Sequence, residues 1–145
     1  MRLCLLALGL LLATASPTLA QSSDFEQVEQ TVSYYLNGGT ANDFELLSRA
    51  FHPTATMRWM GRDGYTDVNA VDYFRDAMRP GPPQERQTRV VSIDVSGNAA
   101  SAILEIDYPR FTFVDFMTLL KIDGEWKIVS KAFYQRMNPA PDSDS

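Results

Sequence analysis

The 145-residue chain is poor in the residues that build disulfides and metal sites, with one cysteine, Cys4, and one histidine, His52. A disulfide needs two cysteines, and a structural zinc site needs about four Cys, His or carboxylate ligands held close together. One Cys, one His and scattered carboxylates supply neither. We therefore expect no disulfide within the chain, no metal and no cofactor.

The sequence also lacks a long apolar run. Residues 3–12 form an apolar segment after a short basic start, and this segment is too short to serve as a permanent membrane span. Thr18-Leu19-Ala20 then provides small residues where a signal peptidase reads the chain. Residues 1–20 are thus predicted to be a signal peptide, cleaved after Ala20, which implies export to the periplasm or medium with no membrane anchor. Cys4 would leave with this peptide.

Basic side chains are fewer than acidic ones. Without residues 1–20 the chain keeps 12 Lys and Arg against 18 Asp and Glu, and none of the basic residues form a run. Nucleic acids are bound by clustered positive charge, so nucleic acid is not expected as a partner. The length fits one domain, which we place at residues 24–136, followed by a Pro-, Asp- and Ser-rich tail at 137–145 predicted to be disordered.

Helical patterns occupy the first half of this domain. The first predicted helix runs from Phe25 until Asn37-Gly38-Gly39 ends it, the second starts with a capping box at Asn42 and is ended by Pro53, and the third starts at Thr66 or Asp67 and ends before Pro80. A strand is expected between the second and third helices, at residues 54–59. The rest of the domain alternates polar and apolar residues as strands do.

Strands are predicted at residues 88–95, 99–108 and 111–122, with a fourth after Asp123-Gly124, a dipeptide that favours a two-residue hairpin turn. Counting from this turn places Met117 opposite Ser130, Asp115 opposite Ala132, and Phe113 opposite Tyr134. Asp115 is then the one acid on an otherwise apolar face. Helices packed on such a curved antiparallel sheet predict an α+β cone.

Two segments carry a family resemblance: Phe51-His52-Pro53-x-Ala55, and the run Leu-Lys-x-Asp-Gly-x-Trp-Lys-Ile at residues 120–128. Through them the chain resembles the nuclear transport factor 2-like (SnoaL-like) superfamily, and within it the branch of small bacterial proteins labelled putative lumazine-binding. The resemblance covers residues 24–136. It implies a cone-shaped fold with an internal cavity and frequent dimers, and its members range from enzymes to accessory domains.

The resemblance also allows two known activities to be compared with this sequence. Isomerases of this fold carry a general-base Asp at a position that an ungapped match from Phe51 places at Trp59, and an indole cannot accept that proton. The fold's dehydratases use paired histidines, whereas His52 is alone and is expected to cap or pack. Neither activity is therefore expected in its usual form.

The candidate binding residues are the polar side chains predicted to face the cavity: Tyr35, Trp59, Asp115, Ser130 and Tyr134. Four of them, Tyr35, Trp59, Ser130 and Tyr134, also have an ordinary structural explanation as core or rim residues. Asp115 needs an explanation, because a buried carboxylate is costly unless it is protonated, hydrogen-bonded or hydrated. A tyrosine hydroxyl or Arg89 are the candidate partners, and a purely structural pair is as consistent with the sequence as a functional one.

Three functions remain open. The first is an exported domain, without catalysis, that binds a small aromatic or hydrophobic molecule. The second is an isomerase, cyclase or dehydratase that uses Asp115 as acid or base. The third is a structural dimerisation module. We also expect a homodimer through the outer sheet face, where the predicted exposed apolar residues are Val114, Phe116, Leu120, Val129 and Phe133.

Overall fold

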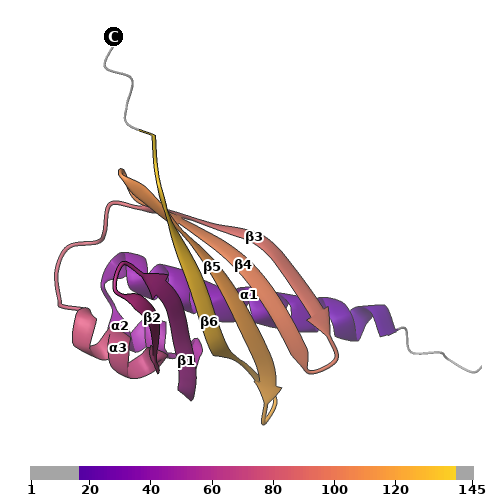
Figure 1. Cartoon of the computed structure of the whole chain (residues 1–145). Coiled ribbons are helices and arrows are strands. Elements are labelled where there is room, and N and C mark those ends of the chain that lie inside the picture. Colours follow the sequence, from indigo (N-terminus) through magenta and orange to yellow (C-terminus); the bar gives the residue numbers. More distant parts are fainter. Residues whose placement is uncertain (1–16, 140–145) are drawn as a thin grey trace, which may run out of the picture.

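The computed structural model describes residues 17–139, in which helices precede most of the sheet (Figure 1). The helices are α1 (Pro17–Ala41), α2 (Phe44–Ser48) and α3 (Ala70–Ala77), and the strands are β1 (Phe51–Gly61), β2 (Gly64–Asn69), β3 (Gln87–Ser96), β4 (Ala99–Asp107), β5 (Phe111–Ile122) and β6 (Glu125–Met137). Most of the predicted signal peptide, residues 1–16, and most of the predicted tail, residues 140–145, lie outside the described residues.

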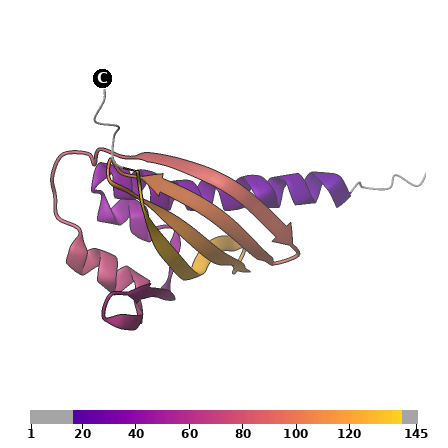
Figure 2. The same ribbon diagram turned by 45° about the horizontal axis from the view of Figure 1, so that its top comes forward.

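The six strands form one sheet in the order β2-β1-β6-β5-β4-β3. Only β1 and β6 are parallel; the other neighbours are antiparallel. Figures 1 and 2 show α1 lying along one face of the curved sheet, with α2 and α3 gathered at one end. The predicted cone-shaped α+β fold is confirmed.

The core lies between α1 and the inner sheet face. Val28, Val32 and Tyr35 recur at helical spacing on α1 and are buried, as are Leu104, Met117, Leu119 and Ile128 of the sheet. Helix α1 continues through Gly38-Gly39, so the predicted helix end there is wrong. A Cβ at Gly38 would stand 2.4 Å from the backbone nitrogen of Leu47, so this glycine instead permits α1 and α2 to approach closely.

The helix starts differ from prediction as well. Asp43, not Asn42, caps the short α2, and Asn69 caps α3 by accepting a hydrogen bond from the backbone of Asp72. The residues predicted to start the third helix, Thr66 and Asp67, instead belong to β2. Pairing with the long strand β1 supplies these residues with backbone hydrogen bonds that a helix start would not.

The hairpin between β5 and β6 contains the difference that matters most for the site. Asp123 and Gly124 have φ of 51° and 83°, as the predicted two-residue turn requires. Leu119 pairs with Ile128 as expected, but Thr118 pairs with Ser130, which leaves Val129 as an extra residue in a β-bulge. Beyond the bulge every side chain of β6 points to the opposite face from the one predicted.

The bulge changes the partners in three predicted pairs. Lys131, not Ser130, lies opposite Met117; Phe133, not Ala132, lies opposite Asp115; and Gln135, not Tyr134, lies opposite Phe113. Lys131 and Phe133 therefore enter the interior. Ser130 and Tyr134 move to the outer face, so the prediction that they share a face with Asp115 is wrong.

Candidate functional site

Three buried polar side chains meet beneath α1: Tyr35, Asp115 and Lys131. The Tyr35 hydroxyl donates a hydrogen bond to Asp115 Oδ2 at 2.7 Å, and the Lys131 ammonium pairs with Asp115 Oδ1. Asp115 is 0% exposed and Lys131 is 4% exposed. Helix α1 and the neighbouring strands β5 and β6 thus hold the Asp115 carboxylate between two hydrogen-bond donors. Its buried charge is satisfied by them.

The environment shifts the proton affinities of both donors. Burial lowers the pKa of Lys131 from its ordinary value, and the positive charge of Arg86 adds to this effect, while the Asp115 carboxylate opposes it. Burial also raises the pKa of Tyr35 well above its ordinary value, and the charge of Asp115 acts in the same direction. Tyr35 therefore remains a hydrogen-bond donor at physiological pH, whereas Lys131 releases its proton more readily than a surface lysine.

Lys131 also lines a cavity of about 150 Å³, here called the inner cavity. Its other lining residues are Tyr35, Met57, Tyr73, Phe74, Arg86, Ile106, Tyr108, Phe113 and Phe133. The Lys131 nitrogen lies 4.2 Å from the centre of the Phe133 ring, which is a cation–π distance. The inner cavity is thus mostly aromatic, with a lysine and an arginine in its wall.

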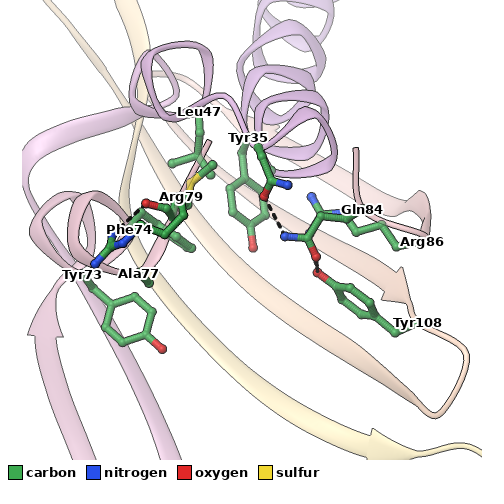
Figure 3. Close-up of a pocket in the computed structure, with 12 residues that line it drawn as sticks. Tyr35, Leu47, Tyr73, Phe74, Ala77, Arg79, Gln84, Arg86 and Tyr108 are labelled. Atoms are coloured by element: carbon green, nitrogen blue, oxygen red, sulfur yellow. Dashed lines mark hydrogen bonds between the residues drawn. The ribbon is translucent and has the colours of Figure 1, made fainter. Parts of the chain in front are cut away.

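A second hollow of about 380 Å³, the outer pocket, adjoins the inner cavity and shares Tyr35, Tyr73, Phe74, Arg86 and Tyr108 with it. Figure 3 shows Tyr73, Phe74 and Arg79 on one side of the outer pocket and Gln84, Arg86 and Tyr108 on the other, with Tyr35 between them. The two hollows are therefore neighbours that share part of their walls.

Arg86, which lines both hollows, links α1 to Tyr108 through three hydrogen bonds. Its Nη2 donates to the Leu36 carbonyl at 3.0 Å, its Nε to Thr40 Oγ1 at 2.9 Å, and its Nη1 to the Tyr108 hydroxyl at 2.9 Å. A guanidinium has five N–H groups, so these three bonds leave donors that can serve a ligand.

The structure brings only some of the predicted site residues together. Tyr35 and Asp115 are in direct contact, and the tyrosine hydroxyl expected as a partner of Asp115 is present. Trp59 stacks on Phe133, with ring centres 5.2 Å apart, and so supports a cavity residue without lining the cavity itself. Asp115 lines neither the inner cavity nor the outer pocket. It can influence a ligand only through Tyr35 and Lys131, which it contacts.

The remaining predicted residues lie elsewhere. Ser130 accepts a 3.4 Å hydrogen bond from Arg58, and Tyr134 is 65% exposed on the outer face. The predicted alternative partner Arg89 pairs with Glu105 instead of Asp115. His52 lies on β1, where its Nδ1 is 2.8 Å from Thr54 Oγ1.

Sequence reasoning missed two functional candidates, Lys131 and Arg86. Strict alternation from the turn puts Lys131 on the outer face, and no residue type marks the bulge at Val129. Arg86 follows a Pro-rich loop and carries no periodic signal. Both positions depend on contacts between segments far apart in the chain.

The described residues offer little for other chemistries. Between residues 17 and 139 no three His, Cys, Asp or Glu side chains gather as a metal site. Within the same range no helix has the length and apolar character needed to cross a membrane. The chemistry available at the cavity is hydrogen-bond donation, aromatic stacking and proton exchange between Lys131 and Asp115.

Comparison with known proteins agrees with this architecture. Residues 23–134 match the protein family described as "Putative lumazine-binding". An NTF2-like protein of unknown function from Shewanella baltica OS155 is 29% identical, with a TM-score of 0.69 over 82% of this chain and 97% of its own. A second one, from Methylobacillus flagellatus KT, is 30% identical, with a TM-score of 0.69 over 79% of this chain and 93% of its own.

One relative carries an enzyme name. The protein "Aldolase FrzH" from Cladobotryum sp. is 25% identical over 120 residues, which cover 78% of this chain and 92% of that protein. The family match spans most of the chain, and the solved structures share its helices and curved sheet. The chain therefore belongs to the putative lumazine-binding family of NTF2-like proteins.

Proposed function

We propose that the protein binds, without altering it, a small and mostly apolar molecule that carries a carbonyl or carboxylate oxygen. The observation that carries this proposal is the inner cavity, where aromatic walls surround the donors Lys131 and Arg86. Ligand sites are typically apolar hollows with a few convergent polar groups. Since both of these groups donate, the ligand must accept.

The size of the hollows indicates the size of the ligand. A closed apolar cavity of about 150 Å³ holds a molecule the size of benzene, which matches the inner cavity volume of about 150 Å³. The adjoining outer pocket, at about 380 Å³, leaves room for a larger substituent. This favours a ligand with one ring among Phe113, Phe133 and Tyr35.

The family description supports the same ligand class. Lumazine is a flat bicyclic ring system with two carbonyl oxygens, so it combines a stacking surface with acceptors. No residue of this chain identifies lumazine itself as the ligand, but it is a suitable first probe.

Binding can be measured by calorimetry with lumazine, benzoate and toluene. We expect benzoate and lumazine to bind more tightly than toluene, which has a ring and no acceptor. A charge-assisted hydrogen bond contributes about 1.5–3 kcal/mol, so Lys131→Met should lower the affinity for benzoate and lumazine by roughly 10- to 100-fold. Lys127→Met, on the exposed Lys127–Glu125 ion pair, is the matched control. Equal affinities for benzoate and toluene, or no binding of any probe, would contradict the proposal.

A second proposal is cofactor-free catalysis at the same residues, as an isomerase, cyclase or dehydratase in which Asp115 takes part as acid or base. The contact of Asp115 with Lys131 and Tyr35 supports it, as does the likeness to a protein named an aldolase. Proton transfer next to a carbonyl can be followed as deuterium uptake from D₂O into acetophenone. Asp115→Asn should preserve ligand binding and abolish uptake; uptake that persists in this variant excludes Asp115 as the base.

The outer sheet face supports a homodimer. Phe116 and Tyr134 are 50% and 65% exposed there, and Leu120 is 38% exposed. Phe133, predicted on this face, has turned inward with the bulge, and Tyr134 takes its place. Exposed apolar groups gathered on one face commonly meet a partner. Sedimentation at micromolar concentration should show twice the protomer mass, reduced by Phe116→Glu but not by Phe25→Glu on α1; a monomer of the unmodified protein would refute the dimer.

A further inference from the structure

Lys131 differs from the other lysines of the chain. The sequence has three lysines, at positions 121, 127 and 131, and all three lie in the described residues. The side chains of Lys121 and Lys127 are 31% and 27% exposed, whereas that of Lys131 is 5% exposed. Lys121 bonds to Asp24 and Lys127 to Glu125, both in contact with solvent. Only Lys131 lines the inner cavity.

A cavity lysine can serve as a nucleophile when two conditions hold. Its nitrogen must lose a proton more readily than an ordinary lysine, and burial, with the charge of Arg86, lowers the pKa of Lys131 against the opposing effect of Asp115. A group must also receive that proton, and Asp115 Oδ1 is in hydrogen-bond contact with the Lys131 nitrogen. The Tyr35 hydroxyl, 2.7 Å from the other carboxylate oxygen, fixes the orientation of Asp115.

The surroundings of the nitrogen suit a carbonyl compound. The ring of Phe133 lies 4.2 Å from the nitrogen and Tyr35 lies 5.7 Å from it, so a flat apolar ligand that enters the cavity can meet the amine with its carbonyl carbon. The Lys131 side chain is only 5% exposed, and this limited access of water disfavours hydrolysis of a carbon–nitrogen double bond once it has formed.

We propose that Lys131 forms a covalent imine with the carbonyl carbon of a small aromatic aldehyde or ketone bound in the inner cavity. This goes beyond the proposed non-covalent binding and rests on it as its first step. The ammonium first passes one proton to Asp115, and the free amine attacks the carbonyl carbon, forming a carbon–nitrogen bond as the carbonyl π bond breaks. The oxygen takes up two protons, one returned by Asp115 and one from the attacking nitrogen, and leaves as water. The net change converts an ammonium and a carbonyl into a protonated imine and one water molecule, so atoms and charge balance.

Reductive trapping tests this step. The protein is incubated near neutral pH with benzaldehyde and sodium cyanoborohydride, whose hydride converts an imine into a stable benzylamine. Peptide mapping by mass spectrometry then reports which amine carries the benzyl group. We expect label at Lys131 before Lys121, Lys127 or the N-terminal amine. If the amount of label on each amine instead follows its solvent exposure, so that Lys131 is the least modified, the proposal is overturned. This comparison needs no variant.

Two variants sharpen the result. Lys131→Arg keeps a positive charge beside Asp115 but cannot form this imine, so it should lose the early label, whereas Lys121→Arg should keep it. If Lys131→Arg fails to fold, the competition among lysines in the unmodified protein still answers the question.

Binding measured without the reductant separates the two proposals. Saturable binding of benzaldehyde or benzoate without early label at Lys131 refutes the imine and leaves the binding function intact. Failure of both ligands to bind refutes the binding function as well.

Discussion

Replacing Lys131 by methionine should destabilise the protein strongly at pH 7 and much less at pH 5. Methionine fills most of the same space but leaves Asp115 buried, with Tyr35 as its remaining hydrogen-bond partner. Removal of one member of a buried ion pair typically costs about 3–5 kcal/mol, because the other charge is left uncompensated. The variant can limit this cost only if Asp115 takes up a proton on folding.

Protonation sets the magnitude of the effect. An unfolded aspartate has a pKa of about 3.9, so keeping it protonated at pH 7 costs about 4 kcal/mol, at roughly 1.4 kcal/mol per pH unit. At pH 5 the same calculation gives about 1.5 kcal/mol. The folded variant then binds more protons than the unfolded chain, so its stability rises as the pH falls. We expect a loss of about 3–4 kcal/mol at pH 7 and about 1–2 kcal/mol at pH 5, relative to the unmodified protein.

The variant of the partner residue, Asp115→Leu, should show the opposite dependence of stability on pH. Asp115→Leu leaves Lys131 buried without its carboxylate, so the lysine must fold in its neutral form while the unfolded chain keeps the proton. Its stability should therefore rise with pH. The double variant Lys131→Met/Asp115→Leu removes both charges and should recover most of the lost stability, since apolar replacement of a buried pair is often neutral or stabilising.

Urea unfolding at pH 5, 7 and 9 measures these differences. Lys127→Met is the matched control, because its partner Glu125 is 72% exposed and an ion pair that reaches solvent should contribute less than about 1 kcal/mol. A loss below about 0.5 kcal/mol for Lys131→Met at pH 7, or equal losses at pH 5 and pH 7, would refute the inference that Asp115 depends on Lys131.

Three further outcomes are expected. Gly38→Ala should cost about 1–3 kcal/mol in thermal unfolding, because the new Cβ would stand 2.4 Å from the Leu47 nitrogen; an unchanged midpoint would show that α1 and α2 can separate freely. Exported protein should begin after Ala20 by intact mass, and material that retains residues 1–20 would contradict the signal-peptide prediction. A β,γ-unsaturated ketosteroid should not isomerise above the buffer rate, because Trp59 stands where the base was expected; a measurable rate would place the base elsewhere.

The sequence alone was enough for most of the fold. Short-range signals were sufficient, because the 3.6-residue spacing of Val28, Val32 and Tyr35 marks a buried helix face and Asp123-Gly124 marks a tight turn. Alternation along β5 also correctly placed Asp115 on the inner face, where it pairs with Leu104 of β4. The β2 strand was missed because its six residues become a strand only by pairing with β1.

The site was decided by tertiary structure. One extra residue at Val129 reverses the direction of every side chain beyond it, since successive residues of a strand face opposite sides. That reversal brings Lys131 to Asp115 and moves Ser130 and Tyr134 to the outer face. Arg86 reaches the cavity through bonds to α1 and to Tyr108, 22 residues further along the chain. The sequence determined that a buried carboxylate needs a partner; only the register of β6 and the packing of α1 determined that its partners are Lys131 and Tyr35.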